Sequence, residues 1–229
     1  MKRYLKPDER QRLLNAAYRT NDPLAQRDYH LMSALYYSAC RVGEFLQLTL
    51  SDAWAALKTG SLFIPAEYRK GRVYEKTNRA GKTVQVDTRQ PAYVHLTQPL
   101  RMHLVALLNM NDCQQGGAPL VPGRFGQALT VRAVQLRVEH WAQEAGLGFK
   151  ASPHWLRHSR AMDILRTSTA KNPLQIVQSV LAHASLNSTA IYAGPSREEI
   201  EATLEALDGK AGRTTKAQLR RDYQQRRAG

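Results

Sequence analysis

Apolar residues recur every three or four positions through most of the chain, which is the spacing of one helical face. In residues 4–19, Pro7 suits the first helical turn, and the two acidic residues after it suit the positive end of the helix dipole. Helical spacing recurs in seven later segments, which comprise residues 22–39, 42–48, 98–110, 130–146, 152–166, 173–183 and 195–209. The sequence therefore predicts a mainly helical fold.

The periodicity changes between residues 61 and 96, where β-branched and alternating stretches replace the helical spacing. These stretches predict strands, which cover residues 61–65, 72–76, 82–87 and 92–96. With a turn at residues 78–81, they indicate a small antiparallel sheet with basic hairpins over residues 62–96. The expected fold class is α+β, mainly helical, with this sheet on one edge. We expect one large domain over residues 1–209.

Charge narrows the choice of partners. The 229 residues carry a formal net charge of +14, which favours a polyanion, and nucleic acid is the first candidate. A membrane surface is the rival, but no apolar run approaches about 20 residues and no signal pattern precedes the first helix. Residues 210–229 hold seven basic residues and one acidic residue, which predicts a basic tail that neutralises phosphates.

The chain has two cysteines, Cys40 and Cys113. Two cysteines so far apart form neither a disulfide framework nor a metal-ligand motif. The simplest compartment is a reducing cytoplasm.

The stretch "SPHWLRHSR" places His154, Arg157 and His158 at helical spacing on one face. Two imidazoles and a guanidinium on one face suit a bound phosphate, whose oxygens a guanidinium binds bidentately. Taken alone, a solvated basic face is an equally good interpretation. In "ACRVGEFLQL", Arg41 and Glu44 are three residues apart, and this spacing alone favours a local ion pair between them.

The stretch "LAHASLNSTAIYAG" places His183 and Tyr192 nine residues apart. A free tyrosine has a pKa near ~10 and is a weak nucleophile, but neighbouring cations favour its phenolate. Such cations also stabilise the charge of a pentacoordinate phosphorus transition state. Considered singly, Tyr192 would more often be a packing residue.

Together these segments resemble the catalytic domain of the tyrosine recombinase (phage integrase) family. The family's first box, roughly T-G-x-R-x-x-E-L-x-x-L, is similar to "SACRVGEFLQL". Its H-x-L-R-H box is similar to "HWLRH", and its third box to "LAHASLNSTAIY". The order and separations fit from about residue 5 to about residue 207. Two glycines of these boxes are replaced, by Cys40 in the first and by Ala182 in the third.

The resemblance implies that the protein is a site-specific DNA recombinase that forms a covalent 3′-phosphotyrosine, with Tyr192 as the nucleophile. Arg41 and Arg157 would bind the scissile phosphate, and Glu44 would brace the site. His154 would bind the phosphate or accept a proton, and His183 would hydrogen-bond the phosphate. The family's hairpin lysine, the general acid, is most similar to Lys70, with Lys76 and Lys82 as competitors.

Further DNA contacts are expected from basic side chains near these boxes, namely Arg69, Arg72, Lys76, His158 and Arg160. The expected partner is double-stranded DNA, bound by four protomers, with no membrane, metal or other cofactor, in a bacterial cytoplasm; the free protein could be a monomer. We expect these residues to lack the helical DNA-clamping domain that usually precedes the family's catalytic domain, so the chain is either a fragment or a one-domain recombinase. Alternatives are a type IB topoisomerase, a catalytically silent DNA-binding protein and a metal-dependent nuclease using His154, His158 and His183.

Overall fold

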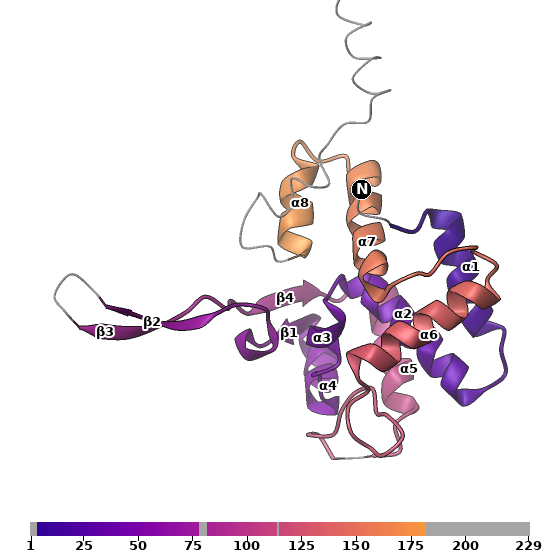
Figure 1. Ribbon diagram of the computed structural model, residues 1–229, viewed down its shortest axis with the longest axis horizontal. Helices are drawn as coiled ribbons and strands as arrows, with labels where there is room; N and C mark the ends of the chain where they lie inside the picture. Colours follow the sequence, from indigo (N-terminus) through magenta and orange to yellow (C-terminus); the bar gives the residue numbers. More distant parts are fainter. Residues whose placement is uncertain (1–3, 78–81, 114, 182–229) are drawn as a thin grey trace, which may run out of the picture. The chain divides into compact units, whose positions relative to one another are not determined.

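The computed structural model describes residues 4–77, 82–113 and 115–181, all of which belong to one compact unit that spans Met1–Tyr192. Its described elements are mainly helical, which confirms the predicted fold class (Figure 1). The helices are α1 (Pro7–Tyr18), α2 (Pro23–Ser38), α3 (Val42–Phe45), α4 (Leu50–Thr59), α5 (Gln98–Asn109), α6 (Val131–Glu144), α7 (Pro153–Thr167), α8 (Pro173–Val180) and the short 3-10 helix η1 (Ala66–Tyr68). Of the predicted helices, 195–209 lies outside the described residues.

The strands form two separate antiparallel pairs instead of the single sheet that the sequence predicted. They are β1 (Ser61–Ile64), β2 (Val73–Thr77), β3 (Thr83–Asp87) and β4 (Ala92–His95). β1 pairs with β4 and buries Leu62 and Ile64 against the helices, whereas β2 and β3 pair only with each other. Because neither β2 nor β3 has a buried side chain, nothing holds this ribbon against the core, and it extends away from the helices (Figure 1).

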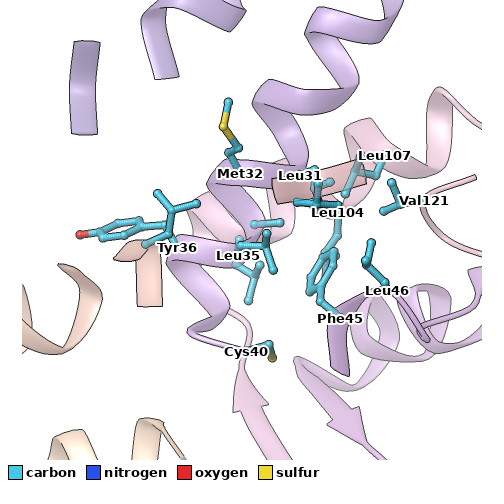
Figure 2. Close-up of a cluster of buried hydrophobic side chains, with 14 of the residues drawn as sticks. Leu31, Met32, Leu35, Tyr36, Cys40, Phe45, Leu46, Leu104, Leu107 and Val121 are labelled. Atoms are coloured by element: carbon cyan, nitrogen blue, oxygen red, sulfur yellow. The ribbon is translucent and has the colours of Figure 1, made fainter. Parts of the chain in front are cut away.

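Helix α2 is the centre of the core and packs against α1, α5 and α7. Its apolar face carries Leu31 and Leu35, which meet Phe45 of α3 and Leu104 of α5 in a closely packed cluster (Figure 2). Each of these four side chains is at most 2% exposed. Their burial is the main source of stability at the junction of the helices.

The ends of α2 follow from local sequence. The Asp22 side chain accepts a hydrogen bond from the backbone N–H of Ala25 at 2.8 Å, and Pro23 occupies the first turn. At the other end Ala39 has φ 53° and ψ 20°, the left-handed conformation that usually ends helices at glycine. This residue turns the chain sharply, so that α3 begins after only two more residues, Cys40 and Arg41.

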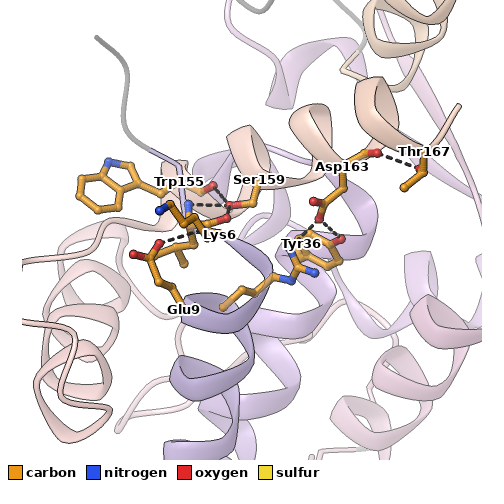
Figure 3. A network of polar contacts seen from close by, with 9 residues as sticks. Lys6, Glu9, Tyr36, Trp155, Ser159, Asp163 and Thr167 are labelled. Atoms are coloured by element: carbon orange, nitrogen blue, oxygen red, sulfur yellow. Dashed lines mark hydrogen bonds and ion pairs between the residues drawn. The ribbon is translucent and has the colours of Figure 1, made fainter. Parts of the chain in front are cut away.

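Helix α7 is fastened to α1 and α2 by polar contacts (Figure 3). Asp163 accepts hydrogen bonds from the Arg10 guanidinium at 2.5 Å and from the Tyr36 hydroxyl at 2.6 Å. In the middle of α7, the buried Ser159 hydroxyl accepts a hydrogen bond from the backbone N–H of Leu5 at 2.9 Å. These contacts hold in place the helix that carries the HWLRH box. No helix in the described ranges is long and apolar enough to span a bilayer.

Candidate active site

Arg41 is the N-cap residue of α3, and its side chain is about one-third exposed. The Nη1 of Arg41 donates to Oε1 of Glu44 at 2.7 Å, and its backbone N–H donates to Oε2 at 3.0 Å. Glu44 itself is only 3% exposed. The local ion pair that the spacing favoured is therefore present, and the buried carboxylate sets the direction of the Arg41 guanidinium.

Arg157 is 3% exposed and lies in the first half of α7. Its Nη1 donates to the carbonyl oxygen of Ala39, and its Nη2 donates to the carbonyl oxygen of Leu181 at 2.7 Å. Ala39 and Leu181 are the C-cap residues of α2 and α8. The Arg157 guanidinium therefore joins α7 to the ends of two other helices. Two main-chain acceptors on different sides fix the plane of the guanidinium.

A small pocket lies between these segments, and it collects the charged residues of the site. Its walls come from the end of α2, from α3, β1, β4 and α7, and from the end of α8. The charged residues that line it are Glu44, Arg69 and Arg157, and Tyr93 of β4 lies beside them. Guanidinium groups bind anions with several oxygen atoms, such as a phosphate diester, and two of them line this pocket beside one carboxylate.

Cys40 lines the same pocket, and its thiol is inert. Burial raises the pKa of the Cys40 thiol to about 11, although the nearby Arg157 and Arg69 act in the opposite direction. A thiol with so high a pKa is protonated at neutral pH and is a poor nucleophile.

The helical face predicted for the HWLRH box is present, but its members differ in exposure. His154 is exposed, and its ring meets that of the buried His158 edge to face, with centroids 4.2 Å apart. The Arg160 guanidinium lies over the rings of Tyr36 and Tyr37, at 5.3 and 5.6 Å from their centroids. His158 is thus buried and Arg160 packs on two aromatic rings, and the DNA contacts that the sequence predicted for these two residues stay predictions.

The basic residues near the ribbon divide into two groups. Arg69 follows η1 and lines the pocket, whereas the neighbouring Lys70 is exposed. The side chains of Arg72, Lys76 and Lys82 are exposed along the ribbon. Because the pocket holds Arg69 and none of these lysines, Arg69 is the basic residue of this segment that stands beside Arg157.

Two predicted residues, His183 and Tyr192, lie outside the described residues. The described chain ends at Leu181, whose carbonyl oxygen accepts the hydrogen bond from Arg157. Arg157 thus contacts the chain two residues before His183.

Two features of the site were not recognised in the sequence. The glycine-like backbone conformation of the first box occurs at Ala39, so the replaced glycine of that box corresponds to Ala39 and not to Cys40. The position of the box already contains this information, since Ala39 stands two residues before Arg41, where the pattern T-G-x-R has its glycine. The pocket position of Tyr93 depends on the pairing of β4 with β1, which no local pattern reveals.

The fold defines the class of protein. A crystal structure of XerA recombinase superimposes with a TM-score of 0.66 at 22% sequence identity, covering 92% of this chain and 65% of that one. A structure of XerH site-specific recombinase bound to a palindromic difH substrate, in a post-cleavage complex, gives 0.60 at 21% identity, covering 90% of this chain and 53% of that one. The fold is that of tyrosine recombinase catalytic domains.

The sequence identifies the family directly. The profile described as "Phage integrase family" matches residues 3–199, and the chain belongs to this family. Tyrosine recombinase XerC of Neisseria gonorrhoeae is 32% identical over 186 residues, which are 79% of this chain and 51% of that protein. XerC of Proteus mirabilis is 27% identical over 206 residues, or 90% of this chain and 59% of that protein. The chain thus spans about half the length of these curated relatives.

Proposed function

We propose that the protein cleaves and rejoins DNA strands as a site-specific recombinase, through a covalent 3′-phosphotyrosine at Tyr192. The observation that carries the proposal is the pocket in which Arg157 and Arg69 meet the carboxylate that orients Arg41. Two guanidinium groups line this small pocket, and a third is bound to the carboxylate in its wall, so cationic donors gather where a phosphate could be held. Because the chain belongs to the phage integrase family, the anion that we propose for this place is a DNA phosphate.

In the proposed reaction the phenolic oxygen of Tyr192 attacks a backbone phosphorus atom in line with the 5′ oxygen, and the phenolic proton passes to His154, the proposed acceptor. The new bond joins tyrosine to phosphorus, and the bond from phosphorus to the 5′ oxygen breaks, so the energy of the phosphodiester is kept. Arg41 and Arg157 stabilise the additional negative charge of the pentacoordinate transition state. The departing 5′ oxygen takes a proton and leaves as a hydroxyl group.

Lys70 is proposed as the donor of that proton, with Lys76 and Lys82 as competitors. Arg69 is a poor candidate for proton donation, because a guanidinium keeps its proton at any pH at which the protein is folded. Arg69 is better suited to hold charge on the phosphate. His154 and His183 are proposed as further phosphate contacts, and Arg72 and Lys76 as contacts to the DNA backbone.

DNA substrates that carry a nick beside the cleavage position test the proposal, because the short fragment diffuses away and traps the adduct. The DNA flanking the gene supplies the sequences to screen. The wild-type protein should form a covalent adduct that survives denaturation. Tyr192→Phe should form no adduct, while its DNA affinity stays within about twofold, since only one hydroxyl group is removed. If the wild type forms no adduct on any flanking sequence, the protein binds DNA without cleaving it.

Strand exchange between two differently labelled duplexes distinguishes recombination from simple relaxation. In a recombinase the 5′ hydroxyl of the second duplex attacks the phosphotyrosine, which forms a new phosphodiester and releases Tyr192, and we expect four protomers on two duplexes in that complex. A type IB topoisomerase would reseal the original strand only. Activity that persists in a chelator would count against a metal-dependent nuclease.

A further inference from the structure

Ala39 has a conformation that L-amino acids adopt rarely. Its φ of 53° is the single positive φ at a non-glycine residue within the described part of the chain. A Cβ in the left-handed region crowds the adjacent carbonyl oxygen, so this conformation costs free energy in any residue except glycine. Such outliers persist where the surrounding structure requires them, and they concentrate at functional sites.

Two contacts hold Ala39 in this conformation. Its carbonyl oxygen accepts the hydrogen bond from Nη1 of Arg157. Its methyl group is fully buried in a small cluster with Ala161 of α7 and with Val177 and Leu181 at α8. Ala39 therefore touches both helices that lie on either side of the pocket.

The position of Ala39 in the chain adds a third effect. Only Cys40 separates it from Arg41, which begins α3 with extended backbone angles of φ −69° and ψ 143°. The left-handed turn at Ala39 therefore sets the direction in which Arg41 leaves α2. Ala39 thus affects the orientation of Arg41 through the backbone that joins them, and the orientation of Arg157 through a hydrogen bond.

We propose that Ala39 is a positioning residue, whose left-handed conformation fixes the guanidinium groups of Arg41 and Arg157 relative to each other. The proposal rests on the proposed function for its catalytic consequence, but the pinning of Arg157 is independent of any reaction. A phosphate held by two guanidinium groups requires their spacing to be set before DNA arrives, because an error of about 1 Å in such a site costs about 100-fold in rate.

The pinning of Arg157 is measured first, by NMR of arginine side chains. In the wild type, rotation about the Cζ–Nη bonds of Arg157 should be slow and its Hη protons should give separate, protected signals. Ala39→Gly accepts the same φ without a Cβ, so these signals should persist. Ala39→Val should lose them, since a β-branched residue is poorly tolerated in the left-handed region.

Ala161→Val is the matched control. It adds the same two methyl groups to the same small cluster, but from a position inside α7, where the backbone is helical and does not take the left-handed conformation of Ala39. It should lower the melting temperature as Ala39→Val does, and it should keep the Arg157 signals. Averaged Hη signals in the wild type would show that the Arg157 guanidinium rotates freely, and this result would overturn the proposal. The test therefore does not depend on whether Ala39→Val folds. Equal loss in Ala161→Val and Ala39→Val would also overturn it.

Covalent adduct formation then tests the catalytic consequence. Ala39→Val should form the adduct about 100-fold more slowly at unchanged DNA affinity, whereas Ala39→Gly should stay within about threefold of the wild type. In an Arg157→Lys background, Ala39→Val should slow the reaction further by clearly less than the roughly 100-fold expected in the wild type, because only its effect on Arg41 remains. Additive losses would show that Ala39 acts by another route. A wild type that pins Arg157 but forms no adduct would refute the proposed function and leave the pinning intact.

Discussion

Two imidazoles in the core predict how stability changes with pH. The Nδ1 atoms of His103 on α5 and His30 on α2 are 2.9 Å apart, and His103 is only 4% exposed. The ring of Tyr37 stacks on His103 with centroids 5.7 Å apart, and Tyr29 meets it edge-on at 5.5 Å. One Nδ1 must donate and the other accept, so a proton added to the accepting nitrogen would place two donors face to face.

Burial, with a smaller effect from His30, lowers the pKa of His103 from 6.5 to about 4. His103 therefore binds a proton near pH 6.5 in the unfolded chain, but only near pH 4 in the folded protein. Stability should be constant above this window, fall as the pH falls through it and level off below it. A full difference of one proton costs ~1.4 kcal/mol per pH unit, and the unfolded histidine is half protonated at its pKa, so a drop from pH 7.5 to 5.0 should remove about 2 kcal/mol.

The assay is urea unfolding followed by tryptophan fluorescence at several pH values between 7.5 and 5.0. His103→Asn replaces Nδ1 by an amide atom that can still hydrogen-bond His30 but does not titrate, so it should remove about 2 kcal/mol of pH dependence. The control is His140→Asn, at an exposed position on α6, which should keep the wild-type pH dependence. A His103→Asn variant that loses as much stability as the wild type between pH 7.5 and 5.0 would refute the linkage to His103.

Three predictions concern DNA. Glu44→Gln removes the charge that orients Arg41, and it should slow adduct formation about 10- to 100-fold while the DNA dissociation constant, measured by fluorescence anisotropy, changes less than threefold. A 5′-bridging sulfur leaves without a proton, so in a cleavage-rate assay this substrate should rescue Lys70→Ala but not Arg69→Ala; the reverse result would make Arg69 the proton donor. Deleting residues 210–229 should lower the slope of log affinity against log salt by about one unit per lost phosphate contact, and an unchanged slope would exclude the tail from the DNA interface.

Local sequence signals predicted most of the helices because each of those signals acts over a few residues. The Asp-Pro start and apolar spacing predicted α2 as residues 22–39, and the structure has it at Pro23–Ser38. Helix α4 was not predicted, although Thr49 and Asp52 form a capping box there and Gly60 ends the helix with φ 75°. The capping box and the glycine are both local features, so the sequence does contain the information for α4.

The arrangement of the site depends on contacts between distant segments, and spacing alone does not reveal them. The HWLRH box predicted a shared face, but only packing against α2 and α8 decides that Arg157 is buried while His154 is exposed. Alternation along the strands likewise predicted β structure, but not that β1 would pair with β4 and leave the ribbon separate. Spacing alone also does not show that Arg69, and not Lys70, lines the pocket, because this depends on how the chain leaves η1.

The ribbon formed by β2 and β3 has a consequence for how this molecule changes during evolution. Its strands contribute no buried side chain, so their backbone hydrogen bonds should open to hydrogen exchange at a free energy well below that of global unfolding. Substitutions and length changes in it leave the folding of the helices untouched. We therefore expect substitutions in this arm to alter what it touches while the stability of the helices changes little.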